Sequence, residues 1–118
     1  MAQGPEAKIV AKIKAYLKTL GPSCFAYKTT GGRFATSGVP DLCICYKGLY
    51  IALEVKTEVG RPTVLQEQTI KDIVIAGGVS TIVRSVDEAK AIMGDVIEAL
   101  ADYNCIGEMI VKKKGINQ

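Results

Sequence analysis

GVPDLCICYKGLYIALEVK, residues 38–56, decides the fold of this chain. Two runs of apolar and β-favouring residues flank Lys47-Gly48, which predicts two antiparallel strands joined by a two-residue turn. With this turn, Asp41 lies directly opposite Glu54 on the neighbouring strand. A symmetric four-residue loop gives the same pairing, whereas a three-residue loop breaks it. Lys is not a favoured first residue of a two-residue turn, so the pairing remains a prediction.

The predicted pairing brings three charged side chains to one face of the sheet. Side chains alternate along a strand, so Glu54 and Lys56 share a face, and Leu53 and Val55 take the other. Asp41 joins the charged face. Two facing carboxylates repel each other, and they need a positive charge from Lys56 or from a divalent cation. The alternative is a surface Asp beside a common Glu-x-Lys ion pair. The Gly-x-Pro before Asp41 and the apolar opposite face favour a site.

Length and composition predict one domain over residues 1–118, of a size that can bury a hydrophobic core. Residues 103–118 are expected to form an extension that is either mobile or in contact with a second copy. Hydrophobic residues make up 48% and charged residues 23%, and no apolar run has the length of a membrane span. The net charge of +3 is only a weak indication of a polyanionic partner.

The cysteines and the lack of histidine exclude several classes of site. The chain has four Cys without a CxxC pair and no His, which argues against a zinc site and excludes a histidine base. Cys43 and Cys45 share a strand face, and both are predicted to be small core residues. Free cysteines and the lack of a signal-peptide pattern lead us to expect a cytoplasmic location.

Hydrophobic periodicity and turn residues predict the order α-β-β-β-α-β-α. We expect helices over residues 5–20, 63–77 and 85–103, strands over 23–30 and 79–84, and the hairpin between them. Residues 105–111 are ambiguous. A hairpin followed by a β-α-β crossover predicts an α/β fold, in which helices pack on a mixed sheet.

Two polar residues on the predicted helices have two interpretations each. Glu6 projects toward the apolar side of the first helix, as a first-turn acid favoured by the helix dipole or as a third acid of the site. Thr63 and Gln66 match a capping box, but Gln66 also begins an inward-facing stripe with Ile70. Both a capping role and a site role are therefore open for Gln66.

Basic residues could contact a phosphate backbone. Lys28 and Arg33 flank a glycine-rich loop that leads to Asp41, and a cluster of lysines covers residues 112–114. Scattered surface cations are the simpler interpretation for each residue alone.

The chemistry expected of the charged face is that of magnesium. Mg²⁺ takes oxygen ligands, which Asp41, Glu54 and the main-chain carbonyl of Val55 can provide. Such an ion lowers the pKa of a bound water and neutralises charge at a phosphate. Lys56 could orient or deprotonate the attacking water, or stabilise the charge on a pentavalent phosphorane. The combination predicts phosphodiester hydrolysis without a histidine.

The same residues resemble a known motif. Gly38-Val39-Pro40-Asp41 followed by Glu54-Val55-Lys56 resembles the PD-(D/E)xK nuclease motif. With Gly60-Arg61, Gln66 and Gly77-Gly78, the chain resembles more narrowly the virus-type replication-repair nuclease domain, VRR-NUC, from Glu6 to about Ala89. The likeness departs at the helix start around Pro62, Val64 and Leu65, where members are usually more polar.

This resemblance implies a restriction-endonuclease-like core that cleaves DNA with Mg²⁺ or Mn²⁺. It implies that Asp41 and Glu54 hold the metal, that Lys56 is the catalytic lysine and that Gln66 lies near the site. Glu6 would match an acid on the family's first helix and reach the metal directly or through water. The residues implied in DNA binding are Lys28, Arg33 and Arg61. Members of this size resemble homodimeric endonucleases acting on four-way (Holliday) junctions.

Three functions are therefore compared. The first is a structure-selective endonuclease acting on branched DNA as a homodimer, whose two sites would match the symmetry of a four-way junction. The second is a non-catalytic nucleic-acid-binding module, suggested by the lysine-rich first helix and the lysines at 112–114. The third is a nuclease acting on linear duplex or flap DNA, although the chain has no apparent extra region for reading base sequence.

Overall fold

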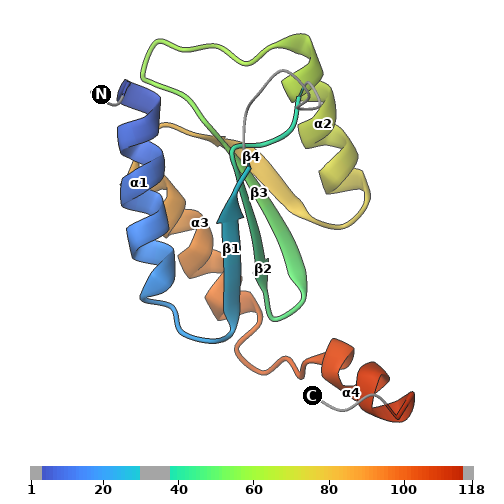
Figure 1. The fold of residues 1–118 in the computed structure, drawn as a ribbon. Coiled ribbons are helices and arrows are strands. Elements are labelled where there is room, and N and C mark those ends of the chain that lie inside the picture. The colour runs from blue at the N-terminus through green and yellow to red at the C-terminus, as the bar shows by residue number, and fades with distance from the viewer. Residues whose placement is uncertain (1–3, 30–37, 116–118) are drawn as a thin grey trace.

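The computed structural model describes residues 4–29 and 38–115. Figure 1 shows a four-stranded sheet with helices packed on both of its faces. The elements in chain order are α1 (Pro5–Lys18), β1 (Cys24–Lys28), β2 (Leu42–Tyr46), β3 (Leu49–Val55), α2 (Val64–Ile75), β4 (Val79–Val83), α3 (Val86–Ala99) and α4 (Ile106–Lys113). The predicted order of seven elements is confirmed, and α4 follows them.

The sheet has the strand order β1-β2-β3-β4, with antiparallel pairs except for the parallel pair β3 and β4. The predicted hairpin register is confirmed, because Leu42 pairs with Leu53 and Tyr46 pairs with Leu49. Lys47 and Gly48 both have positive φ angles, of 49° and 92°. Two successive positive φ angles are typical of the two-residue turns that match the twist of a hairpin. The turn therefore forms with a lysine at its first position.

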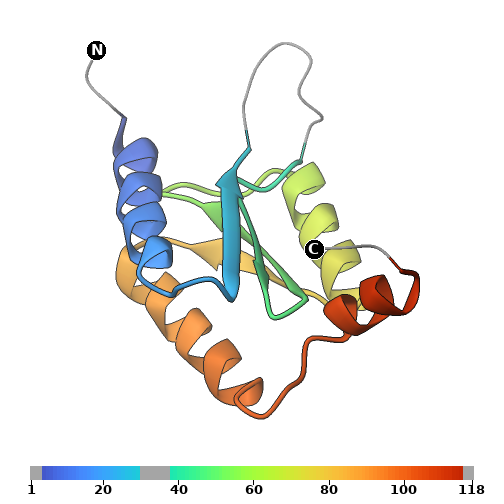
Figure 2. The ribbon, with the colours of Figure 1, turned by 60° about the horizontal axis from the view of Figure 1, so that its bottom comes forward.

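Helices α1 and α3 cover one face of the sheet, and α2 lies on the other face (Figure 2). The hydrophobic core lies between the sheet and helices α1 and α3. Alternate residues of β3 point into this core, and the residues between them point to the opposite face. The largest fully buried side chains are Ile13, Leu42, Ile44, Ile51, Leu53, Met93, Val55 and Val83. Burying each such side chain contributes about 1.5–3 kcal/mol. The core therefore fixes the register that brings Asp41 toward Glu54.

The structure differs from the sequence prediction in the cysteines of β2. Cys43 is buried, but Cys45 is exposed, so the prediction of two core cysteines was wrong for Cys45. The reason is that α2 packs over β3 and β4 and leaves the β1 and β2 half of that face uncovered.

Two other predictions concern the ends of the chain. Helix α3 ends at Ala99 rather than near residue 103, and the ambiguous segment after Cys105 forms α4.

Within residues 4–29 and 38–115, no helix combines the length and apolar character needed to cross a membrane.

Candidate active site

Asp41 is held at the start of β2 by the segment that precedes it. Gly38 has a φ angle of +84°, and a Cβ at this position would lie 2.9 Å from the main-chain oxygen of Leu65 in α2. The Asp41 carbonyl accepts a hydrogen bond from the Thr29 amide at 2.9 Å, and the Thr29 hydroxyl donates to the Pro40 carbonyl at 2.6 Å. Contacts with both α2 and the β1 end therefore position Asp41.

The side chain of Asp41 reaches across to β3. Its Oδ2 atom accepts a hydrogen bond from the Val55 amide at 2.7 Å. The N–H and C=O groups of one strand residue point to the same side, so the Val55 carbonyl also faces the Asp41 side of β3. This geometry is compatible with the predicted role of the Val55 carbonyl as an oxygen ligand.

Glu54 is the buried acid of the site, with 3% of its surface exposed. The pKa of Glu54 is raised to about 8, most of all by burial and then by a hydrogen bond to Asp41 and the negative charges of Asp41 and Glu6, while the charge of Lys56 lowers it. A hydrogen bond between two acids requires that one of them carry a proton. Glu54 Oε1 is buried and has no hydrogen-bond partner among the described residues. An orphaned buried carboxylate oxygen is costly unless a proton or a cation meets it.

Lys56 follows β3 with a half-buried side chain, and its amide donates to the Val83 carbonyl at 3.0 Å. The charge of its ammonium group lowers the pKa of Glu54, so this group is close enough to affect the acids. The structure thus brings Asp41, Glu54 and Lys56 together, as the sequence predicted.

Glu6 lies in the first turn of α1 and is half-buried. Its charge raises the pKa of Glu54 as the weakest of the causes, so the Glu6 carboxylate is near enough to influence Glu54. No group of three or more His, Cys, Asp or Glu side chains is arranged to hold a metal ion within the described part of the chain. The role of Glu6 as a third acid of the site stays a prediction.

Gln66 acts in the capping box that starts α2. Its side-chain Oε1 atom accepts a hydrogen bond from the main-chain amide of Thr63 at 2.8 Å. The main-chain amide of Gln66 donates to the Thr63 hydroxyl at 3.1 Å. The capping interpretation is confirmed, and the site role of Gln66 stays a prediction.

The residues predicted to bind DNA are dispersed. Lys28 is exposed at the end of β1, where it borders a cavity of about 430 Å³ along α1. Arg61 is exposed in the loop after β3, and Arg33 falls outside the described residues. The DNA-binding role of Lys28 and Arg61 stays a prediction.

Arg84 is a positioning residue that the sequence did not indicate. Its guanidinium donates to the carbonyls of Thr57 and, at 2.8 Å, of Gly60, and so it fixes the loop that follows Lys56. Its place directly before the cap of α3 gives no sign of this role, because the contact spans more than twenty residues of sequence.

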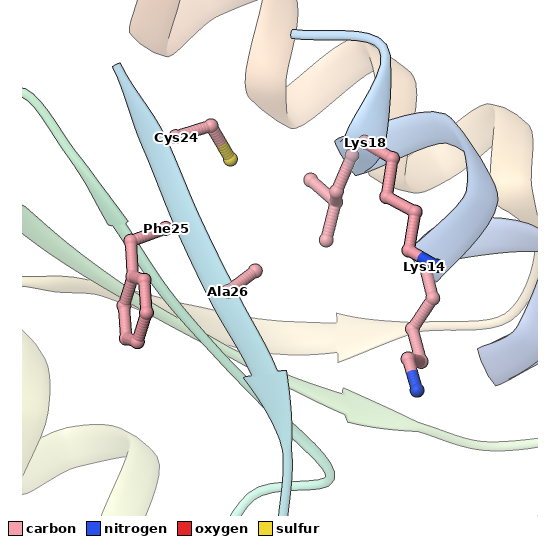
Figure 3. A pocket seen from close by; sticks show the side chains of 6 residues that line it. Lys14, Lys18, Cys24, Phe25 and Ala26 are labelled. Carbon is pink, nitrogen blue, oxygen red and sulfur yellow. The ribbon is translucent and has the colours of Figure 1, made fainter. Parts of the chain in front are cut away.

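A cavity of about 200 Å³ between α1 and β1 contains no carboxylate (Figure 3). Cys24 and Ala26 point toward α1 in this view, and Phe25 points to the opposite side of the strand. Lys14 and Lys18 lie along its rim. The cavity is distinct from the group of acids.

Comparisons with known proteins find solved structures with a similar fold. A solved structure of a VRR_NUC domain matches with a TM-score of 0.65 at 21% sequence identity, covering 78% of this chain and 97% of that one. A VRR_NUC domain protein matches with a TM-score of 0.66 at 14% identity, covering 83% and 92% of the two chains. The chain has the fold of a VRR-NUC domain. No protein-family model matches the sequence, and no curated protein does. The VRR-NUC likeness therefore lies in the fold, which is the restriction-endonuclease-like α/β core that the sequence predicted.

Proposed function

We propose that this VRR-NUC-like chain is a divalent-metal-dependent endonuclease that hydrolyses phosphodiester bonds in DNA. The observation that supports this most is the pair of acids. Asp41 accepts a hydrogen bond from the Val55 amide, and Glu54 is buried beside it with an oxygen that has no donor within the described part of the chain. The nuclease name of the structural neighbours gives independent support for the reaction class.

The acid pair fits a hard divalent cation such as Mg²⁺ or Mn²⁺. Asp41 and Glu54 would hold the ion, and the Val55 carbonyl would offer a third oxygen. Glu6 would act on the ion through a bound water, since its charge is the weakest of the influences on the pKa of Glu54. When bound, the ion lowers the pKa of a water molecule and neutralises charge on the scissile phosphate.

The remaining residues of the site act on the water and the phosphate. Lys56 orients or deprotonates the attacking water, or stabilises the charge that develops on the phosphorane. Gln66 uses its Oε1 atom in the capping box, which leaves its amide NH₂ group as the end that can donate to a phosphate oxygen.

The DNA backbone would be held by the cations around this site. Lys28, Arg33 and Arg61 are the residues proposed for these contacts. The preferred substrate is branched DNA such as a four-way junction, and the chain acts as a homodimer, because paired cuts match a pair of two-fold-related sites.

The test is cleavage of labelled four-way junctions and flaps with Mg²⁺ or Mn²⁺. Asp41→Ala is expected to lower the rate at least a hundredfold, a loss of about 3 kcal/mol in transition-state stabilisation. The matched control is Asp95→Ala, which removes an exposed acid from α3 and should leave the rate unchanged. Equal activity of Asp41→Ala and the wild type would refute the assignment.

A non-catalytic nucleic-acid-binding module is the second candidate, favoured by the four exposed lysines of α1. These residues are Lys8, Lys12, Lys14 and Lys18. Salt-sensitive DNA binding without a calorimetric signal for Mn²⁺ would favour this function over the enzyme. In the same set of substrates, faster cleavage of plain duplex or flaps than of junctions would indicate that the preferred substrate is linear duplex or flap DNA and not a four-way junction.

A further inference from the structure

Helix α4 has an apolar face that the other described residues of its chain leave exposed. Ile106, Met109 and Ile110 occupy positions i, i+3 and i+4, and they are 50%, 64% and 54% exposed. Within the described residues, α4 makes no extended packing contact with another helix or strand. Figure 1 shows it beyond the end of the sheet, connected through a linker.

An eight-residue helix needs such a contact to remain folded. Isolated helices of this length are marginally stable in water. The ion pair between Lys112 and Glu108, at 2.9 Å, is exposed and contributes little. The apolar face of α4, defined by Ile106, Met109 and Ile110, is therefore expected to pack against a surface outside its own fold.

The sheet offers a complementary surface on the side of α2. Phe25, Cys45 and Tyr50 form one row across β1, β2 and β3, and Tyr27 lies in the next row. Phe25 is 69%, Tyr27 52% and Tyr50 43% exposed, and Cys45 is also exposed. We call these four residues the open sheet face. Figure 3 shows Phe25 on the side of β1 away from α1.

The helix of the same chain does not cover this surface. The Lys47 ammonium donates to the Leu100 carbonyl at 3.0 Å, which ties the start of the linker to the hairpin turn. A cavity of about 500 Å³ separates the start of α4 from the open sheet face, and its lining includes Phe25 and Cys45 of that face and Ile106 of the helix. Both halves of an apolar contact are thus present in one chain, and each is exposed among residues 4–29 and 38–115.

We propose that α4 packs on the open sheet face of a second copy of this chain, and that the second copy returns its own α4. A chain that carries both complementary surfaces can form a closed two-fold exchange. This inference rests on the proposed function for the homodimer and identifies its surface. Tyr27 lies one row from Asp41 along the strands, so the partner's helix would border the acid pair.

The first experiment measures mass by light scattering over a range of protein concentrations. The wild type and the control Val59→Lys, at a position 84% exposed in the loop after β3, are expected to be dimers. Two double variants, Met109→Lys/Ile110→Lys and Phe25→Lys/Tyr27→Lys, are expected to weaken the dimer. They should dissociate into monomers at protein concentrations about tenfold or more above those at which the wild type dissociates. Mixing the two variants should recover dimers, because one intact helix then meets one intact face.

The second measurement is a disulfide cross-link in the variant Cys105→Ser/Met109→Cys. Mild oxidation should give a covalent dimer that is lost when Cys45→Ser is added, because Cys45 lies within the open sheet face. A cross-linked monomer would show that α4 folds onto its own chain and would overturn the proposal.

Three other results would also overturn it. The first is a monomeric wild type, and the second is a dimer that neither double variant weakens. The third is a Phe25→Lys/Tyr27→Lys variant whose only defect is weaker binding of single-stranded DNA. A monomeric wild type that still cleaves junctions in an Asp41-dependent way would refute the exchange of α4 between two copies. The proposed nuclease function would then still hold.

Discussion

At the scale of single residues, the site depends on an acid whose position is unfavourable to folding. Glu54 is buried, and its Oε1 atom lacks a hydrogen-bond donor in the described chain. The neighbouring Asp41 makes the ionised form more costly still. Such an arrangement destabilises the metal-free protein, and a cation that meets both acids would reverse the penalty.

The first prediction is a pH dependence of stability that arises from Glu54. Folding raises the pKa of Glu54 from 4.5 to about 8, so the folded state holds a proton that the unfolded state has lost. The contribution is fully present below about pH 4.5 and disappears as the pH rises through about 8. Metal-free wild type should lose roughly 2–5 kcal/mol over this range relative to Glu54→Gln, which has no charge to bury.

Urea unfolding with a chelator at pH 5, 7 and 9 measures this difference. Glu54→Gln should be the more stable protein at pH 9 and inactive in cleavage. The same pH dependence in both proteins would mean that the Glu54 carboxylate is ionised in the folded state throughout.

The sequence predicted the three central residues of the site because strand alternation and a two-residue turn are local rules. Those rules place Asp41, Glu54 and Lys56 on one face. They say nothing of the hydrogen bond from the Val55 amide to Asp41, or of the contact between Arg84 and the loop at Thr57. Both depend on how the ends of the strands meet in three dimensions.

At the scale of elements, Gly38 joins the Asp41 segment to α2. Its φ angle is +84°, and an added Cβ would lie 2.9 Å from both the Leu65 carbonyl and the Thr69 hydroxyl oxygen. Gly21 has nearly the same φ angle, +81°, with open space around it. A comparison of substitutions at the two glycines therefore distinguishes the cost of the backbone conformation, which both share, from the cost of close packing against α2, which applies only to Gly38.

The second prediction compares these glycines. Gly21→Ala should cost about 1 kcal/mol from the backbone conformation alone. Gly38→Ala should cost roughly 2–3 kcal/mol more, because α2 must shift away, and it should also lower cleavage by displacing Asp41. Denaturant unfolding and junction cleavage of both variants measure this. Equal costs for the two variants would show that the Gly38 segment moves freely relative to α2.

The third prediction separates the two roles of Gln66. Gln66→Glu keeps the capping box and suits the helix dipole, so stability should change by less than about 0.5 kcal/mol. Cleavage should fall tenfold or more, because a negative charge replaces an NH₂ donor near the phosphate. Thr63→Ala should instead cost about 1 kcal/mol of stability and keep activity, since it leaves Gln66 in place. Full activity of Gln66→Glu would limit this residue to capping α2.

Element prediction succeeded where the signal was local and failed where it depended on packing. The cap at Thr63 and the turn at Lys47 could be predicted from neighbouring residues. The exposed Cys45 could not, because its burial depends on how far α2 extends over the sheet. Helix α4 was equally hidden, since its apolar face has no partner within the described chain.

At the scale of the whole molecule, the proposed dimer and the proposed reaction make a joint prediction. Two copies would bring two Asp41–Glu54 sites to one junction, and each site would cut one strand. Glu54→Gln should bind DNA without cutting it, so mixed dimers formed with excess variant would have one active site. Such mixtures should accumulate junctions with a single nick, whereas the wild type should release products cut in both strands.

The readout is the ratio of nicked to fully cut junction on a denaturing and a native gel, at a fixed amount of wild type. Dilution of the wild type with buffer is the control, since it lowers the rate but keeps the dimers uniform. If the ratio follows the amount of wild type alone and ignores the added variant, then each copy cuts independently. In that case the symmetry of the junction would not explain the substrate, and the acid pair alone would account for the activity.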